Sequence, residues 1–155
     1  MQAINRQIED KIVDADGRYL SDEEMQPLLN YLSTYKNRLQ SYYYLSQKSD
    51  AIILKALQQL KLSHPDIVEK HGQKCQFDMT EVLRYVALAM LRDDEAFFKE
   101  KLLFWHCTMI RAYSGPAIAA YQHLKATIDG TMPPAQASLI HPYLDLLVNS
   151  LHTYQ

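Results

Sequence analysis

The sequence has few residues that interrupt helices. Its 155 residues include four glycines and six prolines, and 48% of the residues are hydrophobic. This scarcity of breakers in an apolar chain excludes a disordered or collagen-like protein and favours long helices. A chain of this length can bury a sizeable core as one domain. We therefore predict an all-α fold with a single domain over residues 1–155.

Charge of one sign and long hydrophobic runs are also lacking. Sixteen basic and 18 acidic side chains leave a formal net charge of −2, so no basic surface for nucleic acid is expected. No run reaches the roughly 18 apolar residues that cross a bilayer. Charged residues also occupy the N-terminal positions where a signal peptide needs its apolar core. We expect no nucleic-acid partner, no membrane insertion and a cytoplasmic location.

Cysteine is rare too, since Cys75 and Cys107 are the only two. Two cysteines in a chain without an export signal do not form a disulfide framework, although one bridge could form. His71 and Cys75 could be half of a zinc site, but no second ligand pair follows, and we predict no metal. His106 and Cys107 are adjacent and point about 100° apart on a helix, so they cannot grip one small ligand together. Haem ligation by His106 is disfavoured, because a helical histidine is more often packed or solvated.

Hydrophobic periodicity predicts most of the helices. We expect them over about residues 3–13, 21–45, 52–62, 97–113, 117–128 and 135–151, with a central helix in the stretch 72–94. Ser21 and Glu24 have the spacing of a capping box, which starts the second helix. The polar residues 69–74 lead into the central helix. Pro142 must bend the last helix or mark its effective start.

The stretch 72–94 has the sharpest amphipathic pattern in the chain. Its apolar face contains Cys75, Asp78, Met79, Val82, Val86 and Met90. Lys74 and the backbone N–H groups at a helix start would both stabilise a thiolate, which makes Cys75 a candidate nucleophile. The residues alone also allow an inert buried cysteine beside an aspartate that stabilises the helix dipole.

The spacing Cys75-x-x-Asp78 followed by Leu83-Arg84-Tyr85 resembles the chromophore helix of phycobiliproteins, the bilin-carrying globins of cyanobacterial and red-algal antennae. Residues 14–21 (DADGRYLS) resemble that family's entry into its first globin helix, and residues 64–68 (HPDIV) resemble the segment before its bilin site. The resemblance implies a globin-like helical bundle over residues 21–155. It also implies that residues 1–20 are an N-terminal helical extension used for dimerisation. The alternative is that this extension folds back on its own core.

The resemblance implies a cofactor, a linear tetrapyrrole (bilin) of the phycocyanobilin type. It would be covalently attached by a thioether at Cys75, with Asp78 hydrogen-bonded to the pyrrole nitrogens. Phe77 stands where the family usually has an arginine that clamps a propionate, so a weaker clamp is implied. The residues implied to surround the pigment are His71, Lys74, Cys75, Phe77, Asp78, Met79 and Val82. Met79 and Val82 would form an apolar wall. Lys74 and His71 would bind a propionate.

The resemblance also implies partners. In the family, an aspartate of the extension meets the Arg-Tyr of another subunit, and Asp14, Arg84 and Tyr85 retain these residue types. A homodimer, or a heterodimer with a related globin subunit, is implied. A bilin lyase, bilin-synthesis enzymes or a phycobilisome linker are further partners, and the phycobilisome would bring the chain to the thylakoid surface. The alternative is a solvated aspartate and a surface arginine.

Three functions remain open. The leading hypothesis is a bilin-binding protein for light harvesting and energy transfer, or for an accessory role related to bilins. The alternatives are a globin that holds pigment transiently during its synthesis or turnover, and a structural or regulatory globin without pigment. An enzyme is disfavoured, because no catalytic dyad or phosphate-binding loop is visible.

Overall fold

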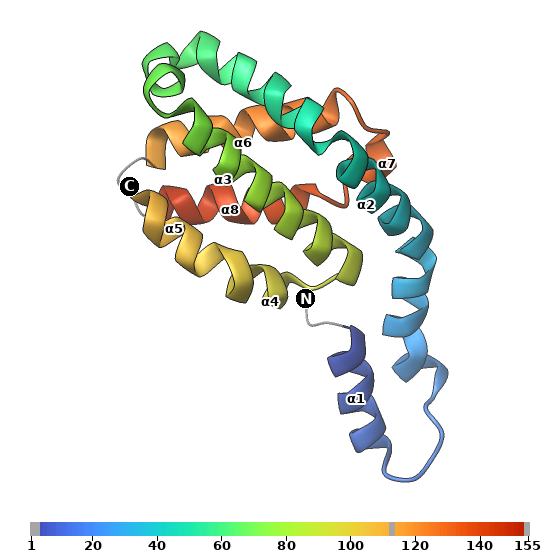
Figure 1. Ribbon diagram of the computed structural model, residues 1–155. Helices are drawn as coiled ribbons and strands as arrows, with labels where there is room; N and C mark the ends of the chain where they lie inside the picture. The colour runs from blue at the N-terminus through green and yellow to red at the C-terminus, as the bar shows by residue number, and fades with distance from the viewer. Residues whose placement is uncertain (1–3, 112–113, 154–155) are drawn as a thin grey trace.

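The computed structural model describes residues 4–111 and 114–153. All regular structure in these ranges is helical, as the sequence predicts (Figure 1). The elements in chain order are α1 (Ile4–Ala15), α2 (Asp22–Ser63), α3 (Pro65–Arg92), α4 (Glu95–Phe98), the π-helix η1 (Lys99–Leu103), α5 (Phe104–Ile110), α6 (Ser114–Asp129), α7 (Pro134–Ala137) and α8 (His141–Thr153). None of the helices in the described ranges combines the length and the apolar character that a membrane span requires.

The second helix is longer than the sequence predicts. The helices expected over residues 21–45 and 52–62 are one continuous helix, α2, of 42 residues. The intervening residues, 46–51, contain neither glycine nor proline, so nothing in the chain stops the helix there. The capping box is confirmed, because the Ser21 hydroxyl accepts from the backbone N–H of Glu24 and the Glu24 carboxylate accepts from the backbone N–H of Ser21. Arg18 also forms an ion pair of 2.8 Å with Glu24.

The central helix starts earlier than expected. The polar residues 69–74 do not form a connecting segment, because α3 already begins at Pro65, a favoured first-turn residue. The helix is interrupted at His71, whose φ of −134° and ψ of 16° are not helical. This kink divides α3 into a short entry arm and a long arm that begins at Gly72. Cys75 therefore lies one turn after the kink.

Two later predictions need refinement. The helix expected over residues 97–113 is continuous as far as Ile110, but it includes the π-helical turn η1; its last two expected residues lie outside the described ranges. The helix expected over residues 135–151 is interrupted by a turn, so Pro142 marks the effective start of α8 rather than a bend within it. A proline in the first turn costs no backbone hydrogen bond, which explains this boundary.

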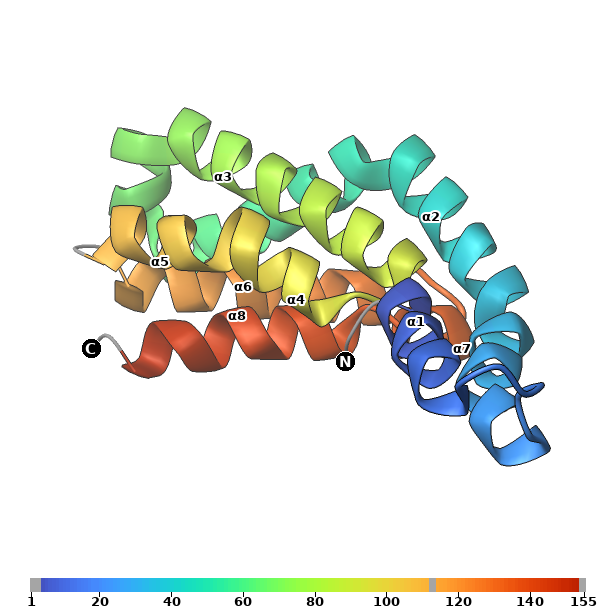
Figure 2. The same cartoon turned by 90° about the horizontal axis from the view of Figure 1, so that it is seen from below.

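The core lies between the long arm of α3 and the helices α2, α6 and α8. Figure 2 shows α3 over α4 and α5, with α8 along the opposite side of the bundle. The largest fully buried side chains lie on α2, α3, α4, η1, α6 and α8 and in the turn before α8: Leu45, Ile53, Leu60, Met79, Leu83, Met90, Phe98, Leu102, Leu124, Ile128, Ile140 and Leu144. At the end of α3, the buried Arg38 donates to the carbonyl oxygen of Met90 and forms an ion pair of 3.0 Å with Asp93. This contact joins α2 to the C-terminal end of α3.

The described part of the N-terminal extension, residues 4–20, does not fold back on the bundle (Figure 1). Instead, α1 lies antiparallel to the first turns of α2, and the two project from the bundle as a hairpin (Figure 1). We call residues 4–35 the N-terminal hairpin. Its connecting turn needs the left-handed backbone of Gly17, where φ is 80°. Several of its apolar side chains are exposed: Ile12, Val13, Tyr19, Leu29, Leu32 and Tyr35.

Candidate functional site

A pocket of about 250 Å³ opens between α3, the end of α5 and the start of α6. Its lining residues are Ile67, His71, Lys74, Cys75, Asp78, Met79, Ile110, Pro116, Ala117, Ala120 and Tyr121. Most of this lining is apolar, and a few polar groups converge on it. Mostly apolar concave sites with a few polar groups are the usual form of small-molecule pockets. Such pockets measure about 300–1,000 Å³, so this one would enclose part of a large ligand and leave the rest outside.

The kink in α3 shapes the entrance of the pocket. The entry arm contributes Ile67, and the long arm contributes Cys75 and Asp78 one turn apart, while His71 at the kink lines the pocket between them. Residues i and i+3 share one helical face, so the thiol and the carboxylate reach the same opening. The sequence-based prediction that both lie on one face is met by this geometry.

Asp78 already has a cationic partner. Its Oδ2 accepts from the Lys74 Nζ at 2.7 Å across one helical turn. Lys74 is more than half exposed, whereas Asp78 is largely covered. An ion pair whose lysine is exposed to solvent contributes little to stability. Asp78 and Lys74 can therefore exchange it for other partners at a small cost in free energy. A carboxylate also has about four acceptor positions, and the bond to Lys74 uses one of them.

The prediction of an activated thiolate at Cys75 is wrong for the chain on its own. Partial burial raises the pKa of the Cys75 thiol, and the negative charge of Asp78 raises this pKa further. Lys74 lowers the pKa, as expected, but its effect is smaller. Burial disfavours the charged form of any thiol, and the nearby carboxylate repels a second negative charge. Cys75 is therefore a half-buried, protonated thiol at neutral pH.

Two of the residues expected around the ligand do not line the pocket. The Phe77 side chain is 63% exposed, because it lies two positions from Cys75 and so on another helical face. Val82 is fully buried in the core one turn beyond Met79. Met79 itself lines the pocket, as do the other expected residues: His71, Lys74, Cys75 and Asp78.

The sequence interpretation missed the wall that faces α3. Ala117, Ala120 and Tyr121 share one face of α6, and this face lines the pocket opposite Cys75 and Asp78. Two alanines one turn apart leave space that a larger side chain would fill. Small residues beside a tyrosine on one apolar face were the signal available in the sequence. That signal does not say which helix lies opposite, because this depends on how the helices pack.

A buried polar pair lies behind the pocket. The Nε2 of His106 on α5 is 2.5 Å from the hydroxyl oxygen of Tyr121 on α6, and both side chains are buried. Burial lowers the pKa of His106 to about 4, while the charge of Asp78 raises it slightly and that of Lys74 lowers it. Burial likewise raises the pKa of Tyr121 well above its usual range. Both groups are neutral at pH 7.

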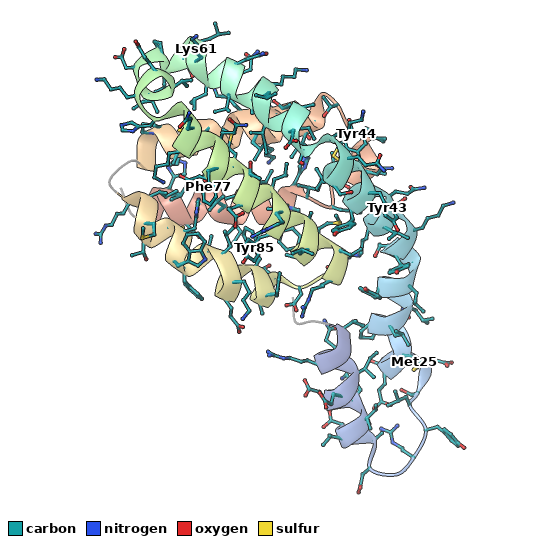
Figure 3. All side chains as sticks on the ribbon, in the orientation of Figure 1. Met25, Tyr43, Tyr44, Lys61, Phe77 and Tyr85 are labelled. Atoms are coloured by element: carbon teal, nitrogen blue, oxygen red, sulfur yellow. The ribbon has the colours of Figure 1, made fainter. Side chains whose placement is uncertain are left out.

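The residues expected at a partner interface do not meet within one chain. Asp14 is exposed on α1, which projects away from the middle of α3, where Tyr85 lies (Figure 3). Arg84 is exposed and forms an ion pair with Glu81, and its guanidinium lies 5.3 Å from the centre of the Tyr85 ring. A contact between Asp14 and Arg84 would therefore need a second subunit.

The described residues, 4–111 and 114–153, contain neither a cluster of metal ligands nor a disulfide bond. No group of three or more metal-ligating side chains comes together in these ranges. Cys75 and Cys107 are both free thiols. Burial raises the pKa of Cys107 to about 11, so this thiol is less acidic than an ordinary cysteine.

Comparison with known proteins identifies the family of this chain. Residues 11–151 match the phycobilisome protein family. The chain belongs to this family. The match covers all but the last two residues of the described bundle and part of the N-terminal hairpin, and the all-α fold agrees with it.

The curated relatives of this phycobilisome protein are distant. It is 26% identical to the allophycocyanin alpha-B chain of Porphyra purpurea, in an alignment that covers 90% of this chain and 95% of the relative. It is 27% identical to the allophycocyanin alpha chain of Thermosynechococcus vestitus, with 73% of this chain and 75% of the relative covered. It is 29% identical to the R-phycocyanin beta chain of Polysiphonia urceolata, but there it spans only 57% of the relative's length.

Proposed function

We propose that this phycobilisome protein is a pigment-holding protein and not an enzyme, and that its pocket takes a linear tetrapyrrole of the phycocyanobilin type. The observation that carries the proposal is the pocket between α3 and α6. Its mouth presents a half-buried thiol, Cys75, and a carboxylate, Asp78, one helical turn apart above an apolar lining. Family membership and the names of the relatives support the same pigment class.

The residues at the mouth fit such a ligand. When bound, a tetrapyrrole supplies an extended conjugated system that absorbs visible light. The Cys75 sulfur would form a thioether by adding to the ethylidene carbon of its first ring, and the thiol proton would pass to the pigment. The addition therefore needs no oxidant and releases no leaving group. Because the pKa of Cys75 is raised, we expect attachment to be slow at neutral pH without a lyase or another base.

Asp78 would hold the centre of the pigment. Its carboxylate offers acceptor positions to pyrrole N–H groups, and hydrogen bonds to an ionised acceptor are roughly twice as strong as those between neutral groups. Lys74 would then leave Asp78 for a propionate, with His71 beside it. Met79 forms the apolar wall on α3, and Ala117 and Ala120 face it from α6.

The role that follows is light harvesting or energy transfer at the cytoplasmic face of the thylakoid, or an accessory role that uses the same pigment. A second candidate is a transient bilin carrier, which holds pigment without a bond during its synthesis or turnover. One observation favours this candidate: the Cys75 thiol is protonated at neutral pH and is only partly exposed.

Co-expression tests the proposal. The full chain would be produced together with a phycocyanobilin-synthesis pathway and a bilin lyase, and the denatured band examined for zinc-enhanced fluorescence. We expect a coloured protein with a fluorescent denatured band. Colour that is lost on denaturation would indicate the transient carrier instead. A colourless native protein would contradict both candidates.

Replacing Asp78 by asparagine should blue-shift and weaken the long-wavelength absorption of the loaded protein. Asparagine keeps the size of the side chain but loses the negative charge that the pyrrole N–H groups would meet. Absorption and fluorescence spectra of the loaded variant measure the effect. Asp66→Asn is the matched control, since Asp66 is exposed on the entry arm of α3 and does not line the pocket. Equal spectra for Asp78→Asn and the unmodified chain would remove Asp78 from this role.

We also infer that the N-terminal hairpin pairs with a second globin subunit, another copy or a relative, through its exposed apolar side chains. Ile12 and Val13 on α1 are 58% and 73% exposed, and such a patch is costly to leave in water. Asp14, next to Val13, would then reach Arg84 and Tyr85 of the second subunit. A linker, a lyase or bilin-synthesis enzymes are further partners of the pigment-bearing form.

Charging this patch should prevent pairing. We expect the purified chain to be a dimer at micromolar concentration and the double variant Ile12→Asp, Val13→Asp to be a monomer, as measured by analytical ultracentrifugation. Leu62→Asp is the control, since Leu62 is 80% exposed at the other end of α2. If the unmodified chain is a monomer, the homodimer is contradicted and only the heterodimer remains. If the double variant is still a dimer, the hairpin is not the pairing surface.

A further inference from the structure

The buried pair of His106 and Tyr121 lies where the pocket meets the core. Tyr121 lines the pocket from α6, and its hydroxyl contacts the Nε2 of His106 on α5 at 2.5 Å. The two side chains are only 2% and 1% exposed, respectively. A buried phenol and a buried imidazole are costly to desolvate, and their mutual hydrogen bond only offsets this cost, so the pair gains the fold little stability over apolar residues.

The pair can act either as a hydrogen-bond donor or as an acceptor. A neutral imidazole carries its proton on Nδ1 or on Nε2. With the proton on Nδ1, the Tyr121 hydroxyl donates to Nε2, and toward the pocket it can only accept a hydrogen bond. With the proton on Nε2, His106 donates to the phenol oxygen, and the Tyr121 O–H is released toward the pocket. The change of tautomer alters no net charge, so the low-dielectric interior tolerates both states.

The side-chain nitrogen donors among the described residues that line the pocket, His71 and Lys74, belong to exposed residues, so Tyr121 is the buried donor. Asp78 is acceptor-only when ionised, and Lys74 is engaged with it at the exposed mouth. Tyr121 has the only hydroxyl among the described residues that line the pocket, and its neighbours Ala117 and Ala120 are apolar. A ligand that places a carbonyl oxygen at this depth would leave it unpaired without Tyr121.

We propose that Tyr121 is a ligand-contacting residue whose O–H donates to the carbonyl oxygen of a terminal lactam ring of the tetrapyrrole, and that His106 positions it by donating from Nε2 to the phenol oxygen. The inference rests on the proposed function, because a linear tetrapyrrole has lactam carbonyls at its ends and N–H groups between them. Asp78 and Tyr121 then divide the recognition. The carboxylate takes the N–H groups near the mouth, and the phenol takes a carbonyl at the inner wall. The pocket should therefore bind a tetrapyrrole without the terminal lactam carbonyl more weakly.

A reversible binding assay tests the contact. Phycocyanobilin is titrated into the full chain carrying Cys75→Ala, so that no thioether forms, and the dissociation constant is measured by absorption. Adding Tyr121→Phe should weaken binding roughly three- to tenfold, the effect of one neutral hydrogen bond. It should also raise the frequency of the lactam carbonyl stretch in the infrared spectrum. Tyr143→Phe is the matched control, because Tyr143 is also buried and its hydroxyl donates to the Ala89 carbonyl outside the pocket.

Variants at His106 separate positioning from packing. His106→Gln keeps a donor near the phenol and should largely retain the carbonyl frequency, whereas His106→Leu should shift it toward the value of Tyr121→Phe. Equal affinities and equal carbonyl frequencies for Tyr121→Phe and Tyr143→Phe would overturn the inference and leave the proposed function standing. Absence of pigment binding by the chain with and without Cys75 would overturn both.

Discussion

Replacing Cys75 by alanine is expected to abolish covalent colour completely. The loaded chain should give a zinc-fluorescent band after denaturation, and Cys75→Ala should give none, because the thioether sulfur is gone. Reversible colour should survive in the native variant, since Asp78 and the apolar lining remain. The measurement is the fluorescence of the denatured band relative to its protein stain.

The control for this loss is Cys107→Ala, which removes the other thiol of the chain. Cys107 is buried beside His106 and does not line the pocket, and burial raises the pKa of its thiol to about 11. We expect this variant to keep the covalent band. Covalent colour that persists in Cys75→Ala and disappears in Cys107→Ala would show that the pigment is attached to Cys107. That result would contradict the proposed site.

Acidification is expected to destabilise the protein through His106. Burial lowers the pKa of His106 to about 4 in the folded chain, against about 6.5 when the histidine is solvated. Between these values the unfolded chain binds a proton that the folded chain does not. The contribution of His106 to stability is therefore fully present above about pH 6.5 and is lost as the pH falls toward 4. We expect the free energy of unfolding to drop by about 2 kcal/mol from pH 7 to pH 4.5, measured by urea unfolding.

The double variant His106→Leu, Tyr121→Phe isolates this effect. Replacing both partners of a buried hydrogen bond by apolar groups of similar shape is close to neutral, so stability at pH 7 should be kept. The drop between pH 7 and pH 4.5 should largely disappear. Glu24, whose pKa the hydrogen bond from Arg18 lowers to about 2, loses its contribution mainly below this window. An equal drop in the double variant and the unmodified chain would show that other groups cause it.

Most of the helices were predictable, because their signals are local. The capping box formed by Ser21 and Glu24 is read from a few neighbouring residues. The sequence interpretation erred where it divided one helix into two, at residues 46–51, and where a helix tolerates a kink, as at His71. Helix propensity is a weak guide at such points, since packing of the long apolar face decides whether a helix continues.

By itself, the sequence determined that the chain is all-α and that Cys75 and Asp78 share one helical face, since both follow from spacing along a single helix. The tertiary structure alone decided what these two residues face. It brought Tyr121 and the alanines of α6 opposite them, buried the Cys75 thiol enough to raise its pKa, and joined His106 to Tyr121. Burial and contacts between helices depend on residues far apart in the chain, and no local pattern encodes them.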